Sequence, residues 1–538
     1  MKRTVATVVI VSIIVLIAIN IINTKNEFYN LKLEELKQEY AIKPVSSIDH
    51  RKLPELQREF DSPQEVTEAC IGCHTERHKE VMKSAHWNWE RVSYIEGRGV
   101  AAAGKKNVLN NFCLGAQSNE MACAKCHIGF GMTNDEFDFD NARNVDCMVC
   151  HDTSEEYQKG SSMAGYPART VNLTEVAQSV GAPDKINCGS CHFFSGGGNN
   201  VKHGDLEVAL LNTNRQVDVH MAANGMDMSC VACHTAENHR IKGRLYSVSS
   251  TDTKRATCEQ CHTGTPHFDD ILNRHTARVS CQACHIPTYA KENATKMAWM
   301  WSEAGKLRDG EPYKEFNSDS TREYQSIKGT FIWAKDVQPD YMWFNGTADH
   351  YLLGDKVDTI PVQMNTLNGS HNGKDSKIIP VKIHRGDQIY DTKYNTLIQP
   401  KLFAENKGDS AYWKDFNWET AVAAGMQRVG LPYSGEYDFV ETEMYWPVNH
   451  MVAPKEQSVS CAECHTRSEE GRLAKLTGFY LPGRDRNKIL DGFGIILFFG
   501  AVIGVSIHAI IRIAVSIRKK KYEMKVIDYE NKLSGNIK

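Results

Sequence analysis

Two long apolar runs, one near each end, dominate the hydrophobic pattern of this 538-residue chain. Residues 5–22 follow Lys2 and Arg3 and span about 27 Å as a helix, close to the thickness of the hydrocarbon layer of a membrane. Residues 493–517 form the second run and precede a basic cluster at 518–521. Because basic residues mark the cytoplasmic side, both runs predict membrane helices whose long connecting segment lies outside the cytoplasm.

Each run has an alternative interpretation. Residues 5–22 resemble a cleaved signal peptide, but no small-x-small cleavage site follows them, which favours an uncleaved anchor. The second run contains His508 and Arg512, four residues apart and therefore on one helical face. This pair indicates either contact with a quinone headgroup or a partner subunit, or packing of His508 while Arg512 extends to the inner interface. We favour the packing interpretation, and both stay open.

The segment between the runs changes character along its length. Residues 26–65 are polar and predict an exposed helix or stalk. Residues 70–285 combine short apolar segments with Gly- and Asn-rich loops, which predicts short helices. Residues 287–449 are rich in aromatics and predict a cover over the preceding part, with short strands at 329–334 and 377–383.

The unusual feature of the composition is the number of cysteines, which is 17. Sixteen of them fall into eight Cys-x-x-Cys-His units, far more than random placement would give. The cysteines are Cys70 and Cys73, Cys123 and Cys126, Cys147 and Cys150, Cys188 and Cys191, Cys230 and Cys233, Cys258 and Cys261, Cys281 and Cys284, and Cys461 and Cys464. The histidines that close these units are, in the same order, His74, His127, His151, His192, His234, His262, His285 and His465.

This spacing fits covalent haem attachment. Two thiols three residues apart lie on about one helical turn, where they add to the two vinyl groups of one porphyrin, and the adjacent histidine then lies under the iron. Zinc sites would not need a histidine after every second cysteine, and disulfides would not need histidine at all. The sequence therefore predicts eight covalently bound haem c groups and no intrachain disulfide, since only Cys113 is left over.

The motifs complete the predicted fold class, which is mainly α. We expect a multihaem cytochrome c with short helices and long loops around a haem array, few short strands, and two terminal transmembrane helices. The predicted parts are an anchor helix at 1–25, a polar stalk at 26–65, an octahaem domain at 66–480 with its eighth motif at 461–465, a second membrane helix at 490–518 and a basic cytoplasmic tail at 519–538.

Location and charge narrow the expected partners. Covalent haem attachment agrees with a cytoplasmic-membrane protein whose bulk domain faces the periplasm or the cell exterior. The formal net charge of −3 gives no basic field, so nucleic acid is not an expected partner. The membrane itself and a quinol-linked membrane cytochrome, or another redox protein, are expected partners. The oligomeric state stays open.

Thirteen histidines lie outside the motifs, and whether each haem receives one of them as a second ligand decides between electron transfer and catalysis. An electron-transfer haem needs two strong ligands, whereas a catalytic haem needs a vacant or displaceable sixth position. If all eight haems have histidine on both faces, the protein is an electron conduit. If one haem lacks a distal histidine, the protein is an enzyme. Sequence position alone does not pair each histidine with a haem.

Longer strings extend beyond the motifs. In the first half they are Asn110-Asn-Phe-Cys113, Cys147-Met-Val-Cys-His-Asp-Thr153, Cys188-Gly-Ser-Cys-His-Phe-Phe194, Val201-Lys-His-Gly-Asp-Leu206 and Asp218-Val-His-Met221. Later ones are Cys258-Glu-Gln-Cys-His262 with Pro266-His267, Leu272-Asn-Arg-His-Thr276, Cys281-Gln-Ala-Cys-His-Ile-Pro287, Lys382-Ile-His-Arg-Gly386, Leu431-Pro-Tyr-Ser-Gly-Glu436 and Tyr445-Trp-Pro-Val-Asn-His-Met-Val-Ala-Pro-Lys455. Through these strings the chain resembles the octahaem tetrathionate reductase family of c-type cytochromes, distant relatives of hydroxylamine oxidoreductase.

The resemblance implies seven haems with two histidine ligands and one active-site haem, attached by the second motif, with a distal lysine. Carried onto this chain, His127 is the proximal ligand and Lys159 the distal one, although Tyr157-Gln-Lys159 departs from the Tyr-Lys-Lys string expected there. A solvated loop lysine is the alternative for Lys159. The strings nominate as distal ligands His86, His203, His220, His239, His267, His275 and His450.

Other residues have open roles. His384 either displaces one of these ligands or lines the substrate pocket, and Cys113 is either a small buried residue or lies near the active haem. The four histidines without a supporting string are expected at the surface: His50, His78, His350 and His371.

The family resemblance implies a reductase. Tetrathionate would be cleaved to two thiosulfates, and nitrite and hydroxylamine would be reduced toward ammonia, so a small anionic or nitrogenous substrate is expected. Lys159, Arg385 and His384 are the candidates to supply protons or positive charge.

Two other functions stay open. The first is a hydroxylamine- or hydrazine-type oxidase on the same framework, which needs a tyrosine cross-linked to the catalytic haem. Tyr480 is the only candidate, without a supporting motif. The second is a non-catalytic electron conduit anchored in the membrane.

Overall fold

The computed structural model describes residues 12–17, 35, 48–112, 115–134, 136–243 and 255–535. Most of the anchor predicted at 1–25, and Cys113, lie outside these residues. The chain divides into two compact units, residues 1–460 and 461–538. The eighth motif therefore belongs to the second unit, whereas the sequence placed it in a domain ending at 480.

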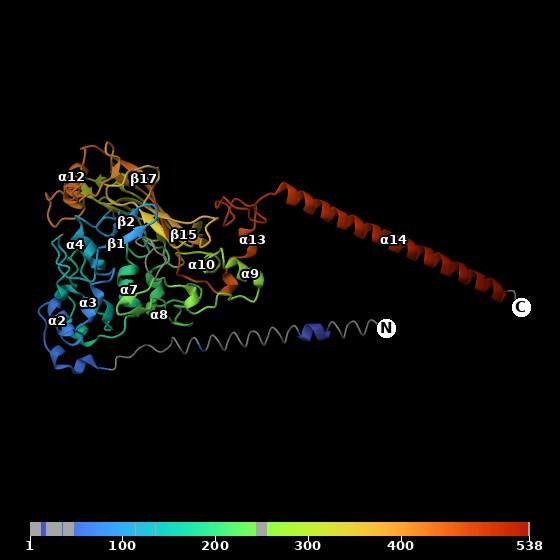
Figure 1. Ribbon diagram of the computed structural model, residues 1–538, viewed down its shortest axis with the longest axis horizontal. Helices are drawn as coiled ribbons and strands as arrows, with labels where there is room; N and C mark the ends of the chain where they lie inside the picture. The colour runs from blue at the N-terminus through green and yellow to red at the C-terminus, as the bar shows by residue number, and fades with distance from the viewer. Residues whose placement is uncertain are drawn as a thin grey trace. The chain divides into compact units, whose positions relative to one another are not determined.

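Short helices joined by long loops make up the motif-bearing half of the first unit (Figure 1). They are α2 (Pro63–Cys73), α3 (Arg77–Val81), α4 (Glu120–Cys123), α5 (Met148–His151), α6 (Leu173–Gln178), α7 (Lys185–His192), α8 (Cys230–Cys233), α9 (Asp270–His275) and α10 (Cys281–His285), with two hairpins formed by β1 (Glu90–Ile95) and β2 (Gly99–Gly104) and by β3 (Ala236–Glu237) and β4 (Arg240–Ile241). Helices this short are not stable alone and depend on tertiary contacts. Side-chain caps help: Asn172 accepts from the backbone N–H groups that begin α6, and Asp184 forms a capping box with Asn187 at α7.

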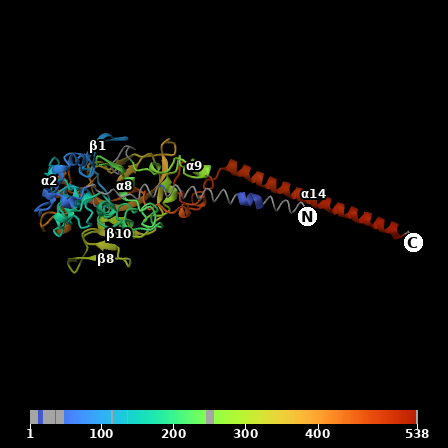
Figure 2. The same cartoon turned by 90° about the horizontal axis from the view of Figure 1, so that it is seen from below.

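A mixed sheet occupies the second half of this unit. Among the described residues it has nine strands, in the order β13-β17-β15-β5-β10-β9-β8, with β11 and β16 also paired to β15. The strands are β5 (Thr295–Met300), β8 (Lys314–Phe316), β9 (Arg322–Gln325), β10 (Gly329–Ala334), β11 (Asp340–Phe344), β13 (Val362–Gln363), β15 (Lys377–Asp391), β16 (Thr396–Leu397) and β17 (Tyr437–Pro447). The hairpin of β8 and β9 projects from the body of the unit (Figure 2).

Smaller elements complete the first unit: the hairpins of β6 (Leu307–Arg308) with β7 (Glu311–Pro312) and of β12 (Ala348–His350) with β14 (Asn365–Leu367), and the helices α11 (Tyr412–Asp415) and α12 (Trp418–Arg428).

The long strand β15 lies at the centre of the sheet. It runs antiparallel to β17 and parallel to β5, and Gly386 makes the close approach to β5 possible. A Cβ at Gly386 would lie 2.6 Å from the carbonyl oxygen of Trp299, which no other residue type avoids.

The prediction of a mainly α fold with few short strands is wrong for this half. The structure is 31% helix and 20% strand. The strands predicted at 329–334 and 377–383 are confirmed as β10 and the first part of β15, and the others were missed. In β15 the buried positions include Lys382, His384 and Gln388, so polar residues point into the core and hide the alternation that marks a strand.

Aromatic side chains fill the core against this sheet. Trp299 stacks on Trp301 with ring centroids 4.8 Å apart, and Tyr412 stacks on Trp418 at 3.6 Å. Burial of each large apolar side chain stabilises the fold by about 1.5–3 kcal/mol. The ammonium of Lys296 lies 3.6 Å from the ring centroid of Phe331, where the negative ring face compensates for its burial. The aromatic cover therefore has a hydrophobic core, to which Leu109, Phe112 and Val201 of the motif-bearing half also contribute.

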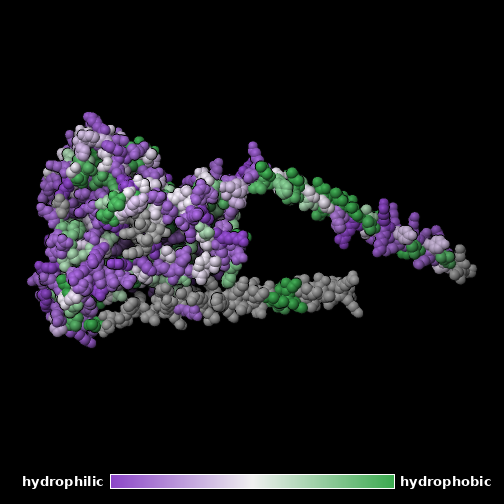
Figure 3. Space-filling view, in the orientation of Figure 1, coloured by the Kyte–Doolittle hydropathy of each residue, from purple (hydrophilic) through white to green (hydrophobic). Residues whose placement is uncertain are grey.

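The second unit contains α13 (Cys461–Cys464) and the long helix α14 (Lys488–Gly535). Within Lys488–Ser534, α14 is long and apolar enough to cross a membrane. Figure 3 shows its apolar part followed by a polar part. Over the described part of the chain α14 is the one candidate span, so the second predicted span, at the N-terminus, stays a prediction.

Candidate haem sites

The motifs have the local geometry that haem attachment needs. Each lies on a short helix or 3-10 turn, which places its two cysteines about one turn apart on one side. In several motifs the backbone N–H of the histidine donates to the first cysteine's carbonyl, as from His74 to Cys70 at 2.8 Å. All sixteen motif cysteines are described, and none forms a disulfide.

Six motif histidines face a second histidine ring across a fixed gap. The centroid distances are 6.5 Å for His74 and His50, 6.3 Å for His151 and His239, 6.2 Å for His192 and His86, 6.2 Å for His234 and His450, 6.2 Å for His262 and His220, and 6.1 Å for His285 and His267. An iron bound by two imidazoles needs ring centroids about 6 Å apart, from two metal–nitrogen bonds of about 2 Å and the offset of each ring centre. These six sites therefore fit haem.

Hydrogen bonds fix the orientation of these rings. Nδ1 of His151 lies 2.9 Å from the Gly181 carbonyl oxygen, and Nδ1 of His234 lies 2.9 Å from that of Lys242. A carbonyl acceptor places the proton on Nδ1 and leaves Nε2 for the metal.

Carboxylates orient two of the opposite rings. Nδ1 of His239 lies 2.9 Å from Glu80, and Nδ1 of His450 lies 3.1 Å from Asp205. Burial tends to raise the pKa of Asp205, but the hydrogen bond and charge of His450 outweigh it and hold that pKa below its ordinary value.

The remaining non-motif histidines have mixed outcomes. His50 and His350, expected at the surface, are not: His50 faces His74, and His350 is 3% exposed. His203 is half-buried with its ring 5.0 Å from Trp446, and Nδ1 of His275 lies 2.8 Å from the Ile271 carbonyl oxygen. Their roles as distal ligands stay predictions.

Thiols of different motifs lie in contact. The neighbouring thiol pairs are Cys70 with Cys147, Cys126 with Cys191, Cys188 with Cys230, and Cys258 with Cys281. These contacts bring together the first and third motifs, the second and fourth, the fourth and fifth, and the sixth and seventh. Porphyrins attached at these thiols are neighbours.

The second motif differs from the six pairs. The ring of His127 lies among Trp87, Trp89, Phe137 and Phe139, with centroid distances of 5.4 to 6.1 Å. Its Nε2 lies 2.5 Å from the Trp87 carbonyl oxygen, and burial lowers its pKa to about 3. In the described ranges no histidine ring faces it, and iron ligation requires Nε2 to leave the Trp87 carbonyl.

Lys159 lies beside this motif in a buried ion pair. Its Nζ is 3.2 Å from the Asp146 carboxylate and donates to the main-chain carbonyls of His127 and Gly129. The side chains of Lys159 and Asp146 are 3% and 0% exposed, so the alternative of a solvated loop lysine is wrong. Ligation of the second iron by this amine would require it to leave Asp146.

The structure separates the other catalytic candidates. His384 is buried against Phe112, with ring centroids 4.0 Å apart, and neither ring nitrogen has a described partner. Burial, together with Lys382 and Lys296, lowers its pKa. Arg385 lies on the opposite face of β15, 3.0 Å from Glu443, and is not brought to His384.

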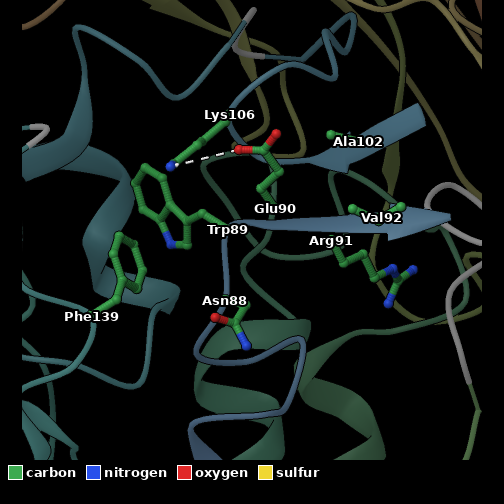
Figure 4. Close-up of a pocket in the computed structure, with 8 residues that line it drawn as sticks. All are labelled: Asn88, Trp89, Glu90, Arg91, Val92, Ala102, Lys106 and Phe139. Carbon is green, nitrogen blue, oxygen red and sulfur yellow. Dashed lines mark ion pairs between the residues drawn. The ribbon is translucent and has the colours of Figure 1, made fainter. Parts of the chain in front are cut away.

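A pocket of about 300 Å³ is lined in part by Trp89 and Phe139 (Figure 4), two of the aromatic residues around the His127 ring. Trp89 lines it and also contacts the His127 ring, and Lys106, 3.6 Å from Glu90, lies beside Phe139. Lys105 lies over the Trp89 ring, and its charge helps to lower the pKa of His127. Sequence analysis missed these lysines because no motif surrounds them.

Comparison with solved structures identifies the family. An octahaem cytochrome c from Shewanella oneidensis is 41% identical, with a TM-score of 0.73, and the match covers 79% of this chain and 95% of that one. The chain belongs to the octahaem family of multihaem c-type cytochromes. Residues 296–468 also match the family described as "Cytochrome c bacterial", and residues 116–196 match "Cytochrome c3". An uncharacterized protein of Archaeoglobus fulgidus is 25% identical over 258 residues, which cover 38% of this chain and 82% of that protein.

Family membership and motifs together make this octahaem cytochrome a multihaem redox protein with covalently bound haem c. A c-type cytochrome domain implies a location outside the cytoplasm.

The facing ring of His50 predicts the effect of removing it. In His50→Leu the first haem loses one imidazole, so we expect one additional high-spin ferric haem by electron paramagnetic resonance of the oxidised protein. His78→Leu, in the neighbouring helix α3, is the matched control and leaves the spectrum unchanged. An unaltered His50→Leu spectrum would rule out this ligand pair.

The carboxylate behind His450 predicts a change in reduction potential. Asp205→Asn removes a negative charge that strengthens the His450 ligand, so the potential of one low-spin haem rises, and stability falls by about 1–3 kcal/mol. Asp227→Asn, at an exposed carboxylate paired with Lys185, is the control. Spectroelectrochemical titration measures both, and equal titration curves would contradict the expected role.

Proposed function

We propose that this octahaem cytochrome is an extracytoplasmic reductase whose substrate binds at the second motif. The observation that carries the proposal is the contrast between His127 and six other motif histidines. Those six face a second imidazole, whereas none faces His127 in the described segments. An iron with imidazole on both faces is closed to substrate, and this contrast supports the second motif as the open site.

Haem c at the motifs supplies one-electron transfer and, where a sixth position is open, a place for a small molecule. The chain's own residues do the rest. Because the two facing imidazoles are held in place as ligands, the surroundings of the iron rearrange little during electron transfer. The contacts from Cys230 to Cys188, and from Cys191 to Cys126, connect the fifth, fourth and second motifs in a continuous order.

Positive side chains favour an anionic substrate. Lys105 and Lys106 lie near the cage of His127, and Glu90 is paired with Lys106. Positive charge raises the local concentration of anions and stabilises charge gained during reduction. Tetrathionate, which takes two electrons and yields two thiosulfate ions, fits this environment. Nitrite and hydroxylamine are further candidates, and they also need protons.

Lys159 has two alternative roles, and experiment can distinguish between them. As a distal ligand, its amine would bind the second iron. As half of the buried pair with Asp146, it positions the backbone of His127 and Gly129. Removal of one partner of a buried pair costs about 3–5 kcal/mol because the other charge is left uncompensated.

A pair of variants tests the site. With reduced viologen as donor, the wild type is expected to reduce at least one of tetrathionate, nitrite and hydroxylamine, and Lys159→Met to lose stability. In Lys159→Met with Asp146→Asn, neither charge is left unpaired, so stability recovers. If turnover also recovers, Lys159 is a positioning residue. If turnover stays lost with a new high-spin haem, Lys159 is the ligand.

The same assay tests the reductase itself. A wild type that reduces none of the three substrates, and whose haem spectrum does not respond to cyanide or nitrite, would be an electron conduit and would overturn the proposal.

A further inference from the structure

The second unit fixes its haem motif to the head of α14. Nδ1 of His465 lies 2.7 Å from the carbonyl oxygen of Pro482, shortly before the helix begins at Lys488. Arg467, two residues beyond the motif, lies 3.8 Å from Asp491 in the first turn of the helix. Contacts from both sides of the loop therefore join the eighth motif to the start of α14.

The loop between motif and helix is itself held tightly. The side chain of Arg484 is 11% exposed and donates to the carbonyl oxygens of Leu473 at 2.8 Å and Phe479 at 2.9 Å. Gly483 has a φ of +85°, and a Cβ there would lie 2.7 Å from the His465 carbonyl oxygen. Only glycine allows the loop to approach the motif this closely.

The helix starts with a defined cap. The Asn487 side chain accepts from the backbone N–H groups of Ile489 and Leu490, each at 3.1 Å. The exposed apolar surface begins at once, with Ile489 83% exposed, and continues to Ile517. If α14 spans a membrane, Asp491 lies at the outer interface and the motif is held at the level of the lipid headgroups.

We propose that the eighth haem is the port through which a membrane hydroquinone delivers electrons to the array. The inference rests on the proposed reductase function, because a reductase must take electrons from a donor, and on α14 crossing the membrane. A hydroquinone gives two electrons and two protons when it becomes a quinone. The electrons enter singly at the haem held by His465, and the protons pass to water at the outer face.

His508 is not part of this port. It lies about 25 Å beyond Asp491 along the helix at 1.5 Å per residue, and about 15 Å before the basic run at 518–521. The port therefore depends on the clamp at the head of α14 and not on the ionisable pair within the membrane segment.

An insertion separates the haem from the membrane. In the full-length holoprotein in liposomes, about ten Gly and Ser residues between Arg486 and Asn487 give a flexible link of roughly 17 Å. The rate at which duroquinol in the bilayer reduces the haems is expected to fall about tenfold or more, because the haem is no longer confined at the surface. The same insertion between Lys521 and Tyr522, beyond the basic cluster, is the control and leaves the rate unchanged.

A second measurement does not depend on turnover. The oxidised, paramagnetic eighth haem is expected to accelerate relaxation of a nitroxide on lipid headgroups more than that of one at the bilayer centre, and the first insertion to abolish this difference. An unchanged duroquinol rate and unchanged relaxation after that insertion would overturn the port, as would a wild type that duroquinol does not reduce. If only the port is wrong, viologen-driven turnover of the insertion variant stays at the wild-type rate. If the reductase proposal is wrong, viologen-driven turnover is absent already in the wild type.

Discussion

Pairs of imidazoles about 6 Å apart, each made of a motif histidine and one from elsewhere in the chain, are the constraint on which the first unit depends. Such a gap is too wide for direct contact between the rings and suits a metal between them. The helices around the pairs are short and have little apolar surface, so they cannot hold the rings in place alone. Coordination of iron and folding of this half are therefore coupled, as in other proteins whose metal binding supplies part of the folding free energy.

The cover works on a different principle. Its sheet buries Lys382 and His384 together with a dense set of aromatics, and Lys382 donates to the Val201 carbonyl oxygen at 2.8 Å and to the Thr295 hydroxyl at 2.6 Å. The first bond ties the central strand to the loop that follows the fourth motif, and the second ties it to the start of β5. Burial lowers the pKa of Lys382 well below its ordinary value, because the low-polarity surroundings disfavour the charged amine. The sheet thus joins the haem-binding half by polar contacts within a largely apolar core.

The sequence predicts the attachment sites well because covalent chemistry fixes a short local pattern. It predicts the opposite ligands less well, since a lone histidine has no local signature. His50 is an example: it follows Asp49, which caps a 3-10 turn, and nothing nearby indicates that its ring meets His74. The cover was predicted to be less sheet-like than it is because buried polar positions disrupt the alternation of β15. The ion pair of Lys159 with Asp146 depends on residues brought together only by the fold.

The order of the facing histidines along the chain has a consequence for biogenesis. His50, His86, His220 and His267 precede the motif histidines that they face, whereas His239 and His450 come after theirs. As the polypeptide is exported from its N-terminal end, four haems meet a second ligand that has already crossed the membrane. The third and fifth haems keep one face without a second ligand for longer. For the fifth haem this lasts until nearly the whole aromatic cover has been translocated. During secretion these two irons are transiently as accessible as a catalytic centre. Arrival of His239 ends that period for the third haem, and closure of the last sheet strands ends it for the fifth.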